Sequence, residues 1–369
     1  MRTYPIPMVP GPVMVPEEVL REYLTGYGSA DLEPEFFMLY EETEKNLQEL
    51  MSTSAQVVIQ SGEGMIALWG ALKSCLRPGD RVLSIGTGVF GDGIGDMAAA
   101  IGAEVRKISL PYNETVRDFY AIEEAVVEFK PKMITAVHCE TPSGTLNPVA
   151  EIGRIKEKHG VPLFYVDAVA SIGGTPVLAD EWSIDLCLGG TQKAISAVPD
   201  LSFLSVSEKA WEIIEEVQYQ GYDALQPFRR AVEQMYFPYT PNWHGMAALH
   251  RATQLILDEG LQQVYERHEK IALYTRQRIA DCGLALFPAP DAIPSPTVTA
   301  VSVPDGVQWA DLDNRFREKG LVVGGSYGPL AGKVFRLGHM GAQARWDLVQ
   351  QALDVIQTVM RELKPQAEA

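Results

Sequence analysis

The chain has 369 residues, 46% of them apolar and 21% charged, which is typical of a globular protein with two domains or one large and one smaller unit. Its net charge of −17 comes from 31 basic and 48 acidic residues and disfavours nucleic acid and anionic membranes as partners. The start of the chain lacks a continuous apolar signal region, and no stretch reaches membrane-spanning length, so we expect a cytoplasmic protein.

Between residues 55 and 206, short apolar runs alternate with helical patterns. The runs predict strands at 55–60, 81–86, 104–110, 132–138, 162–167, 185–190 and 201–206. The helical patterns lie at 64–76, 92–101, 118–129 and 149–159. Strands that alternate with helices of this length predict parallel βαβ units, with both faces of the sheet covered.

The alternation of short apolar runs with helical patterns gives way to a different pattern near residue 246. A long helical pattern covers 246–283, followed by strands at 296–303 and 333–338, a helix at 309–320 and a last helix at 345–363. We predict an α/β fold with a large, mostly parallel sheet domain at 15–245. A smaller α+β domain at 246–369 includes the N-terminal arm 1–14, and its last six residues are expected to form a frayed tail.

The cysteines and histidines give no sign of a metal site. The four cysteines, Cys75, Cys139, Cys187 and Cys282, have no metal-ligand spacing, and we expect reduced, mostly buried thiols. No cluster of His, Cys and Asp has metal-ligand spacing either.

Two residues at strand ends could carry chemistry. Ligands of open parallel sheets bind at the carboxyl ends of the strands, where Asp167 ends one apolar strand and Lys193 follows the next. Limited solvent would lower the pKa of Lys193 and leave a neutral amine available for a Schiff base, and Asp167 could hold a pyridinium nitrogen protonated. Alone, each residue has a simpler interpretation, a surface lysine and a helix-capping or turn aspartate.

Two glycine-rich segments could bind anions. SGEG (61–64) joins a strand to a helix, so its backbone N–H groups form a potential anion cradle or a plain tight turn. Gly86, Gly88 and Gly91 match the dinucleotide fingerprint, which makes a nicotinamide oxidoreductase an alternative. However, the expected acid is missing from the end of the following strand, where Glu104 stands at the start.

Arg336 is a lone arginine inside an apolar strand. A buried arginine requires an anionic partner, so it either captures a substrate carboxylate or forms a structural ion pair. His138 and His339 are expected to be hydrogen-bonded residues of the core or of a loop.

With these residues placed, the chain resembles the class V aminotransferases of fold type I, of the alanine–glyoxylate and serine–pyruvate kind. The resemblance covers essentially the whole chain. It is carried by VPGPV (9–13), VDAVASIGGTP (166–176), GGTQKA (189–194), PTVTAV (296–301) and GKVFRLGHMG (332–341).

The resemblance implies a pyridoxal-type ring held by a defined set of residues. Lys193 matches the Schiff-base lysine, Asp167 the partner of the pyridinium nitrogen, and Arg336 the carboxylate clamp. The remaining cofactor-binding positions are Glu63, Gly64, Met65, Phe90, Thr141, Val169, Gln192, Tyr239 and Thr240. The last two fall where the neighbouring subunit of family members reaches into the site, which implies a homodimer with a shared active site.

Glu63 departs from the family pattern, in which many relatives have Ser or Thr. A carboxylate about 4 Å from a phosphate charge costs about 4 kcal/mol at an effective dielectric constant of ~20, and a dianion roughly doubles this cost. The cradle therefore suits an uncharged hydroxymethyl group better than pyridoxal 5′-phosphate. Alternatively, the side chain turns outward and leaves only its backbone N–H at a phosphate.

This feature makes the chain similar to pyridoxamine–pyruvate aminotransferases, which use unphosphorylated pyridoxamine as a substrate. Further shared segments are LPYNE (110–114), TPSGTLNP (141–148), FPYTP (237–241), PDGV (304–307) and RLGHMG (336–341). Two residues differ. Gln192 is typical of phosphate-binding relatives, and Tyr327, at the substrate-binding end, replaces an expected second arginine.

The sequence therefore predicts amino transfer from pyridoxamine to pyruvate, giving pyridoxal and alanine. The alternative is a pyridoxal-phosphate enzyme that acts on alanine or serine with glyoxylate or pyruvate.

Overall fold

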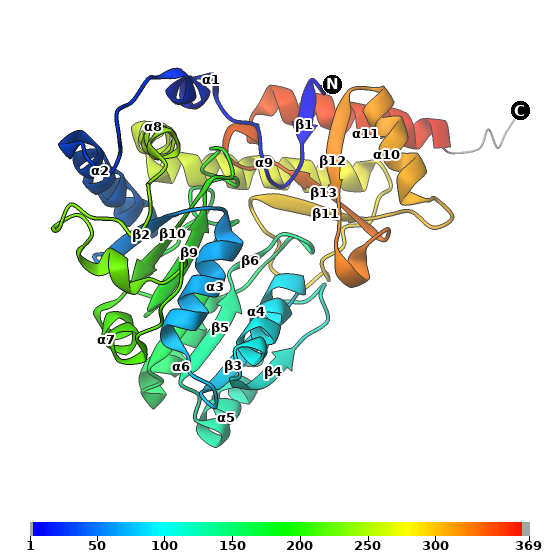
Figure 1. The fold of residues 1–369 in the computed structure, drawn as a ribbon. Coiled ribbons are helices and arrows are strands. Elements are labelled where there is room, and N and C mark those ends of the chain that lie inside the picture. The colour runs from blue at the N-terminus through cyan, green and yellow to red at the C-terminus, as the bar shows by residue number, and fades with distance from the viewer. Residues whose placement is uncertain (1–2, 364–369) are drawn as a thin grey trace, which may run out of the picture.

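A seven-stranded sheet forms the centre of the larger part of the molecule in the computed structural model, which describes residues 3–363 (Figure 1). Its strand order is β2 (Gln56–Ser61), β10 (Leu201–Val206), β9 (Leu186–Gly190), β8 (Leu163–Asp167), β5 (Met133–Val137), β3 (Arg81–Gly86) and β4 (Glu104–Ser109). The α/β fold class is confirmed.

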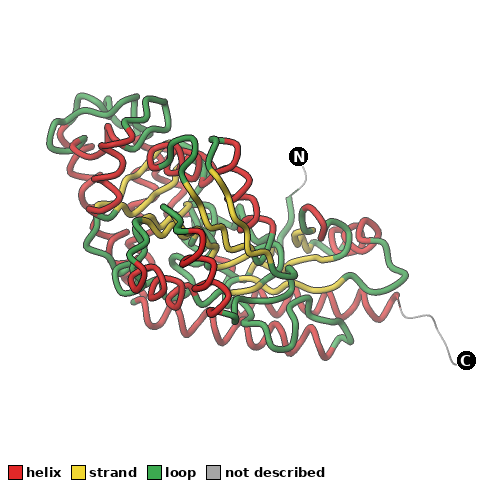
Figure 2. The backbone as a smooth tube through the Cα atoms, turned by 90° about the horizontal axis from the view of Figure 1, so that it is seen from below, coloured by secondary structure: helices red, strands yellow, loops and turns green. Residues whose placement is uncertain are grey.

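Helices lie on both sides of this sheet (Figure 2). They are α2 (Pro34–Met51), α3 (Gly64–Cys75), α4 (Val89–Ala100), α5 (Phe119–Phe129), α6 (Val149–His159), α7 (Glu208–Val217) and α8 (Trp243–Glu259). The central strand β8 is covered on both faces, so Phe164 and Tyr165 are fully buried. Burial of one such apolar side chain stabilises the fold by about 1.5–3 kcal/mol, which explains why this strand has no polar face.

The strand β10 is the exception in a sheet that was predicted to be mostly parallel. It runs antiparallel to both of its neighbours, β9 and β2. The ten residues between Gly190 and Leu201 contain no helix, and a parallel partner requires a crossover of a dozen residues or more. The chain therefore turns back, and the sheet is mostly rather than wholly parallel.

A separate four-stranded sheet forms the centre of the smaller part of the molecule, at the upper right of Figure 1. Its order is β1 (Ile6–Met8), β12 (Leu321–Gly325), β13 (Val334–Gly338) and β11 (Val298–Ser302). The strand β1 pairs in parallel with β12, so the start of the described chain lies in this sheet. The helices α9 (Leu261–Asp281), α10 (Trp309–Glu318) and α11 (Trp346–Leu363) cover it, and their apolar residues form a separate core.

The long helical pattern of 246–283 is two helices rather than one. Gly260 has a φ of +89° and separates α8 from α9, a conformation that glycine adopts without steric cost. Its N–H still bonds the carbonyls of Ile256 and Leu257, so α8 ends in a closed turn and the chain changes direction. The frayed tail expected at 364–369 lies outside the described residues.

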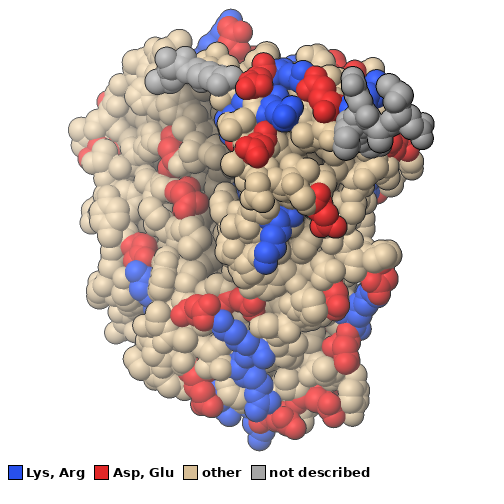
Figure 3. Space-filling view, turned by 90° about the vertical axis from the view of Figure 1, so that its right-hand side faces the viewer, with Lys and Arg blue, Asp and Glu red and all other residues tan. Residues whose placement is uncertain are grey.

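Acidic and basic side chains alternate over a mostly uncharged surface on the face drawn in Figure 3. Within residues 3–363, no helix is both long and apolar enough to cross a membrane. All four cysteines are buried and free, as predicted.

Candidate active site

A cavity of about 170 Å³ lies at the carboxyl ends of the large sheet's parallel strands. Segments that follow β2, β3, β5, β8 and β9 all contribute to it, as expected for this fold class. It is lined by Glu63, Gly64, Met65, Leu68, Phe90, Cys139, Thr141, Asp167, Val169, Ala170, Leu188, Gln192 and Lys193.

Lys193 enters the cavity from the loop after β9. Its Nζ donates a hydrogen bond to the carbonyl of Pro10, in the segment that follows β1. Burial lowers its pKa to about 8, and the nearby positive charge of Arg336 adds to this effect. About a tenth of the amine is therefore neutral at pH 7, far more than for an exposed lysine.

The backbone of Gly11 passes directly over this lysine. A Cβ at Gly11 would lie 2.6 Å from Lys193 Cδ and 2.6 Å from its Nζ, and the φ of +106° is one that other residues rarely adopt. The N-terminal segment can approach the lysine only because residue 11 has no side chain.

Asp167 lies in the same cavity, at the end of β8. Its Oδ1 accepts a hydrogen bond from the Val169 N–H at 2.9 Å, whereas Oδ2 has no hydrogen bond within residues 3–363. Burial raises its pKa to about 6, and the negative charge of Glu63 raises it further, while Lys193 opposes both. This carboxylate is one that a cationic partner would stabilise.

Phe90 lies in the first turn of α4, which begins at Val89, three residues before the start that the pattern predicted. The carboxyl of Glu140 explains this earlier start. It accepts hydrogen bonds from the N–H groups of Gly91 at 2.6 Å and Phe90 at 3.4 Å, so a side chain from a distant segment caps the helix. Glu140 is buried, and burial raises its pKa to about 8.

The same carboxyl removes the dinucleotide alternative. A Cβ at Gly88 would lie 2.4 Å from the carboxyl carbon of Glu140, and one at Gly91 would lie 3.1 Å from its Oε1. The glycines that match the fingerprint thus make room for a buried side chain. The need for glycine at these two positions is thus explained by packing, which argues against the oxidoreductase alternative.

The hairpin of β6 (Cys139–Glu140) and β7 (Thr145–Leu146) brings Thr141 to the cavity wall. Cys139 faces a polar cluster, with its Sγ 3.0 Å from Ser295 Oγ and 3.6 Å from Thr297 Oγ1. Burial raises the pKa of this thiol to about 11, so it is not a thiolate nucleophile.

Glu63 occupies the predicted anion cradle. It is the N-cap of α3, and its Oε1 accepts a hydrogen bond from the Met65 N–H at 3.2 Å. Its Oε2 lies 3.4 Å from the amide nitrogen of Gln192, and the side chain lines the cavity. The positive end of this helix is therefore already supplied with a carboxylate.

Arg336 lies beside the cavity without an acidic partner. Its guanidinium donates to the carbonyls of Gly325, at 2.9 Å from Nε, and Thr141, at 3.4 Å from Nη1. The Tyr327 ring covers it, 4.7 Å from ring centroid to guanidinium carbon. No carboxylate in the described part of the chain forms an ion pair with Arg336, so the structural ion pair is absent there.

Tyr239 and Thr240 lie outside the cavity. The hydroxyl of Tyr239 accepts a hydrogen bond from the Ser61 N–H at 3.2 Å, and its ring stacks on Tyr222 at 4.7 Å. Thr240 is exposed. Within one chain, Tyr239 therefore braces the strand that leads to the cradle, and Thr240 does not take part.

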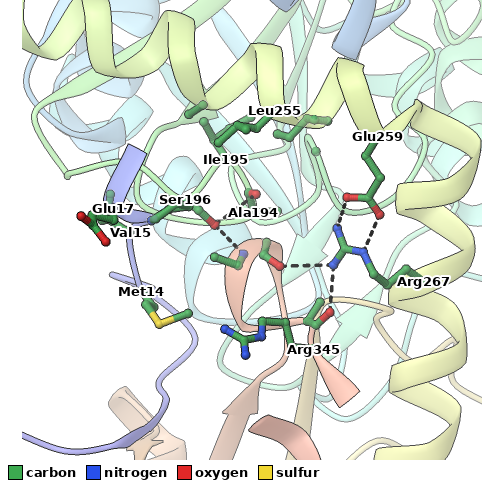
Figure 4. A pocket seen from close by; sticks show the side chains of 17 residues that line it. Met14, Val15, Glu17, Ala194, Ile195, Ser196, Leu255, Glu259, Arg267 and Arg345 are labelled. Carbon is green, nitrogen blue, oxygen red and sulfur yellow. Dashed lines mark hydrogen bonds and ion pairs between the residues drawn. The ribbon is translucent and has the colours of Figure 1, made fainter. Parts of the chain in front are cut away.

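A second cavity, of about 570 Å³, lies near the loop of Lys193 (Figure 4). Its polar groups are satisfied by neighbouring residues. Arg267 pairs with Glu259 and donates to the Ala344 carbonyl, and Ser196 accepts from the Ala342 N–H. This cavity offers no free reactive group.

The sequence model of class V aminotransferases matches residues 10–335. This chain belongs to the class V aminotransferases. It is 33% identical to the pyridoxamine–pyruvate transaminase of Mesorhizobium japonicum over 92% of this chain and 87% of that protein.

Solved structures agree with this aminotransferase assignment. The pyridoxamine–pyruvate aminotransferase of Mesorhizobium loti superposes with a TM-score of 0.93 at 32% identity, over 98% of this chain and 93% of that one. An alanine–glyoxylate aminotransferase of Nostoc sp. gives 0.93 at 30% identity, over 98% and 96% of the two chains.

The cavity of this aminotransferase fits the pyridoxal-type ring that its family implies. Apolar groups flank it, among them Phe90, Val169 and Leu188, and Asp167 has a free oxygen for a ring nitrogen. Gln192 Oε1 is buried without a hydrogen-bond partner, so a polar acceptor is available near Glu63. The residues suit a flat heteroaromatic ring with a basic nitrogen and polar substituents.

Sequence reasoning missed several residues of this site. Pro10, Gly11 and Glu140 act through contacts with distant segments, which local patterns do not reveal. Leu68, Cys139, Ala170 and Leu188 line the cavity but have ordinary core character in the sequence.

Proposed function

We propose that this class V aminotransferase moves an amino group from pyridoxamine to pyruvate, giving pyridoxal and L-alanine. The carbon–nitrogen bond of the aminomethyl group is lost from pyridoxamine and a new one forms at C2 of the keto acid, so no external oxidant or reductant is needed.

The observation that carries the proposal is the position of Glu63. Its carboxylate lies at the N-terminus of α3, where an anion would otherwise bind, and it lines the cavity. Repulsion of a phosphate there, about 4 kcal/mol per charge at ~4 Å, disfavours a phosphorylated ring. An uncharged 5′-hydroxyl can instead donate a hydrogen bond to this carboxylate.

The other residues supply the chemistry of amino transfer. The neutral amine of Lys193 is the nucleophile. Afterwards it is the base that moves the proton between C4′ of the ring and the α-carbon of the amino acid. The oxygen of Asp167 that does not bond to Val169 would accept a hydrogen bond from the ring nitrogen and keep this nitrogen cationic. A pyridoxal ring, when bound, supplies the electron sink that stabilises negative charge on the reacting carbon.

Arg336 is suited to the carboxylate of pyruvate or alanine. It is buried, lacks an ion pair within residues 3–363 and lies against Thr141 at the cavity wall. Its planar fork can bind both oxygens of one carboxylate. Tyr327 covers the guanidinium, which favours a substrate with one carboxylate and a small side chain.

A homodimer is part of this proposal. Large apolar side chains are exposed next to the cradle, among them Met65 at 41%, Ile66 at 42% and Tyr222 at 74%. A continuous exposed apolar patch marks an interface. Light scattering of the wild type should give the mass of a dimer, and Ile66→Asp should lower this mass. A monomeric wild type would contradict this part.

The function is tested by the ligand that remains on the protein. Borohydride reduction followed by peptide mass spectrometry should add unphosphorylated pyridoxal to the Lys193 peptide, and pyridoxamine plus pyruvate should yield pyridoxal. The alternative, a pyridoxal-phosphate enzyme using alanine or serine with glyoxylate, is supported by Gln192. Phosphorylated ligand retained through dialysis, with no pyridoxal formed, would establish this alternative.

A further inference from the structure

Arg276 resembles Arg336 in its lack of an acidic partner. It lies on α9, half-buried, and its Nη1 donates to the Ser295 carbonyl at 3.1 Å. Burial lowers its pKa, as burial lowers that of Arg336. Glu269, two turns earlier on α9, acts on this charge from a distance, but no carboxylate in the described range forms an ion pair with Arg276.

The contrast with Arg267, nine residues earlier on the same helix, shows what is missing. Arg267 also lines a cavity, but Glu259 binds it through two hydrogen bonds, at 2.6 and 2.8 Å (Figure 4). A guanidinium removed from water costs free energy unless an anion compensates it. Arg276 has only one backbone carbonyl, so its capacity to bind an anion is largely unused.

Arg276 borders a third cavity, of about 590 Å³, which does not share a lining residue with the Lys193 cavity. The floor is formed by β11 at Val298–Ala300, one wall by α9 and another by the loop after it. Apart from Arg276, Gln277 and Thr299, the lining is apolar: Gly144, Leu273, Ala280, Leu284, Leu286, Pro288, Ala289, Pro290, Ala292, Pro294, Val298 and Ala300.

The loop wall is held in place by backbone bonds to the catalytic half of the molecule. The Leu146 N–H donates to the Ile293 carbonyl, and the Ser295 N–H donates to the Gly144 carbonyl, both close to 2.9 Å. The Ala289 N–H bonds the Asn113 carbonyl at 2.8 Å. The cavity is therefore formed before any ligand arrives, which lowers the cost of binding.

We propose that this cavity is a second, non-catalytic binding site for a small monocarboxylate with an apolar body. The carboxylate binds the free edge of Arg276, and the apolar body packs on the leucine and proline side chains of the loop. A single cation among apolar walls selects one negative charge over two, because a second carboxylate would be buried without a partner.

The site is independent of Arg336 in its ligand contacts but adjacent to it in the fold. Ala300, on the cavity floor, is the register partner of Arg336 in the pairing of β11 with β13. Gly144, on the cavity wall, belongs to the turn of the hairpin that carries Thr141. The test must therefore separate binding at the two arginines.

Phenylacetate is a suitable probe because it has no keto group and cannot accept an amino group. Isothermal titration on the Arg336→Gln variant, which lacks the other clamp, should show one binding site. Adding Arg276→Gln should weaken this binding at least about tenfold, the loss of one charge-assisted pair. Phenylacetamide, which is neutral, should also bind at least tenfold more weakly.

A second variant covers the case in which Arg276→Gln disturbs folding. Ala280→Phe fills the cavity while leaving both arginines in place, and should likewise abolish probe binding in the Arg336→Gln background. Arg276→Gln alone should keep turnover of pyridoxamine and pyruvate within about twofold. No binding to Arg336→Gln, or equal binding when Arg276 or the cavity is altered, would overturn the proposal without affecting the proposed reaction.

Discussion

The two ends of the catalytic cavity have opposite charge. At one end the carboxylate of Glu63 occupies the N-terminus of α3. At the other end the guanidinium of Arg336 is buried without an ion pair in the described part of the chain. Lys193 lies between them, and its pKa responds to both, since Arg336 lowers it and Glu63 raises it.

This difference indicates which end of the cavity receives an anion. A helix N-terminus binds anions by default, and here a side chain of the protein takes that role. A buried arginine without an acid requires an anion from elsewhere. Because the Arg336 end lacks an ion pair in the described part of the chain, the proposed reaction assigns the keto acid to that end and an uncharged ring substituent to the Glu63 end.

The largest effect is expected from removing the residue between the two ends. Lys193→Ala should lower turnover by about 10⁴-fold, because both the nucleophile and the base are lost. Steady-state assays measure this loss, and circular dichroism controls for the fold. A variant with a tenth of wild-type activity would place the chemistry elsewhere.

Removing the negative charge of Glu63 should change which form of the ring, phosphorylated or not, binds more tightly. Glu63→Ser removes a repulsion of about 4 kcal/mol, so pyridoxal 5′-phosphate should bind about 10²–10³-fold more tightly. Spectroscopic titration measures this change, and Glu63→Gln, which removes the charge but keeps the size, is the matched control. Unchanged affinity in both variants would mean that Glu63 does not repel the phosphate.

Weakening the Arg336 end of the cavity should impair the use of the keto acid and leave the binding of the ring nearly unchanged. Arg336→Gln should lower kcat/KM for pyruvate about 30–100-fold, as expected for the loss of a charge-assisted hydrogen-bond pair of about 2–3 kcal/mol. The KM for pyridoxamine should stay within a few fold. An equal loss for both substrates would argue against two separate ends.

The pH profile should report the charges on both sides of the lysine. The reaction needs Asp167 ionised and Lys193 neutral, so activity should fall as pH drops through about 6 and rise as pH increases through about 8. Arg336→Gln removes a positive charge that lowers the pKa of Lys193, so it should move the upper limb to higher pH. A profile with no inflection near 8 would contradict this account.

The smallest effect is expected at the positioning residue Glu140. Its pKa of about 8 means that the carboxyl is mostly neutral at pH 7, so Glu140→Gln should lower kcat/KM no more than about threefold. Glu140→Ala leaves the N–H groups of Phe90 and Gly91 without their acceptor and should cost about tenfold. Binding of the pyridoxal-type ring to each variant should be followed by the absorbance of the ring. Equal activity of Glu140→Gln and Glu140→Ala would contradict a positioning role for Glu140.

The sequence predicted the parts of the molecule that depend on local pattern. Asp167 and Lys193 each follow an apolar strand, and the fold class requires such strand ends to meet at one edge of the sheet. The cavity therefore brings together most of the residues predicted for it. Arg336 was predicted in the same way, as a charged residue in an apolar strand.

The features that were missed depend on contacts between distant segments. Glu140 caps α4 from 49 residues away, and this moves the start of the helix to Val89. The antiparallel direction of β10 follows from the length of its connection rather than from the composition of the strand. The helix α2 was also not predicted, and it packs against α8, which lies about 200 residues later in the chain.

The segment after β1 has a mechanical consequence for the catalytic lysine. This segment starts in the four-stranded sheet, and the Pro10 carbonyl holds the amine that follows β9 of the seven-stranded sheet. A rotation of one sheet relative to the other that stretched this hydrogen bond would free the amine, so we expect the reactivity of Lys193 to depend on how the two sheets are placed. Locking the halves together by a cross-link should then slow the attack of the amine even with every side chain of the cavity intact.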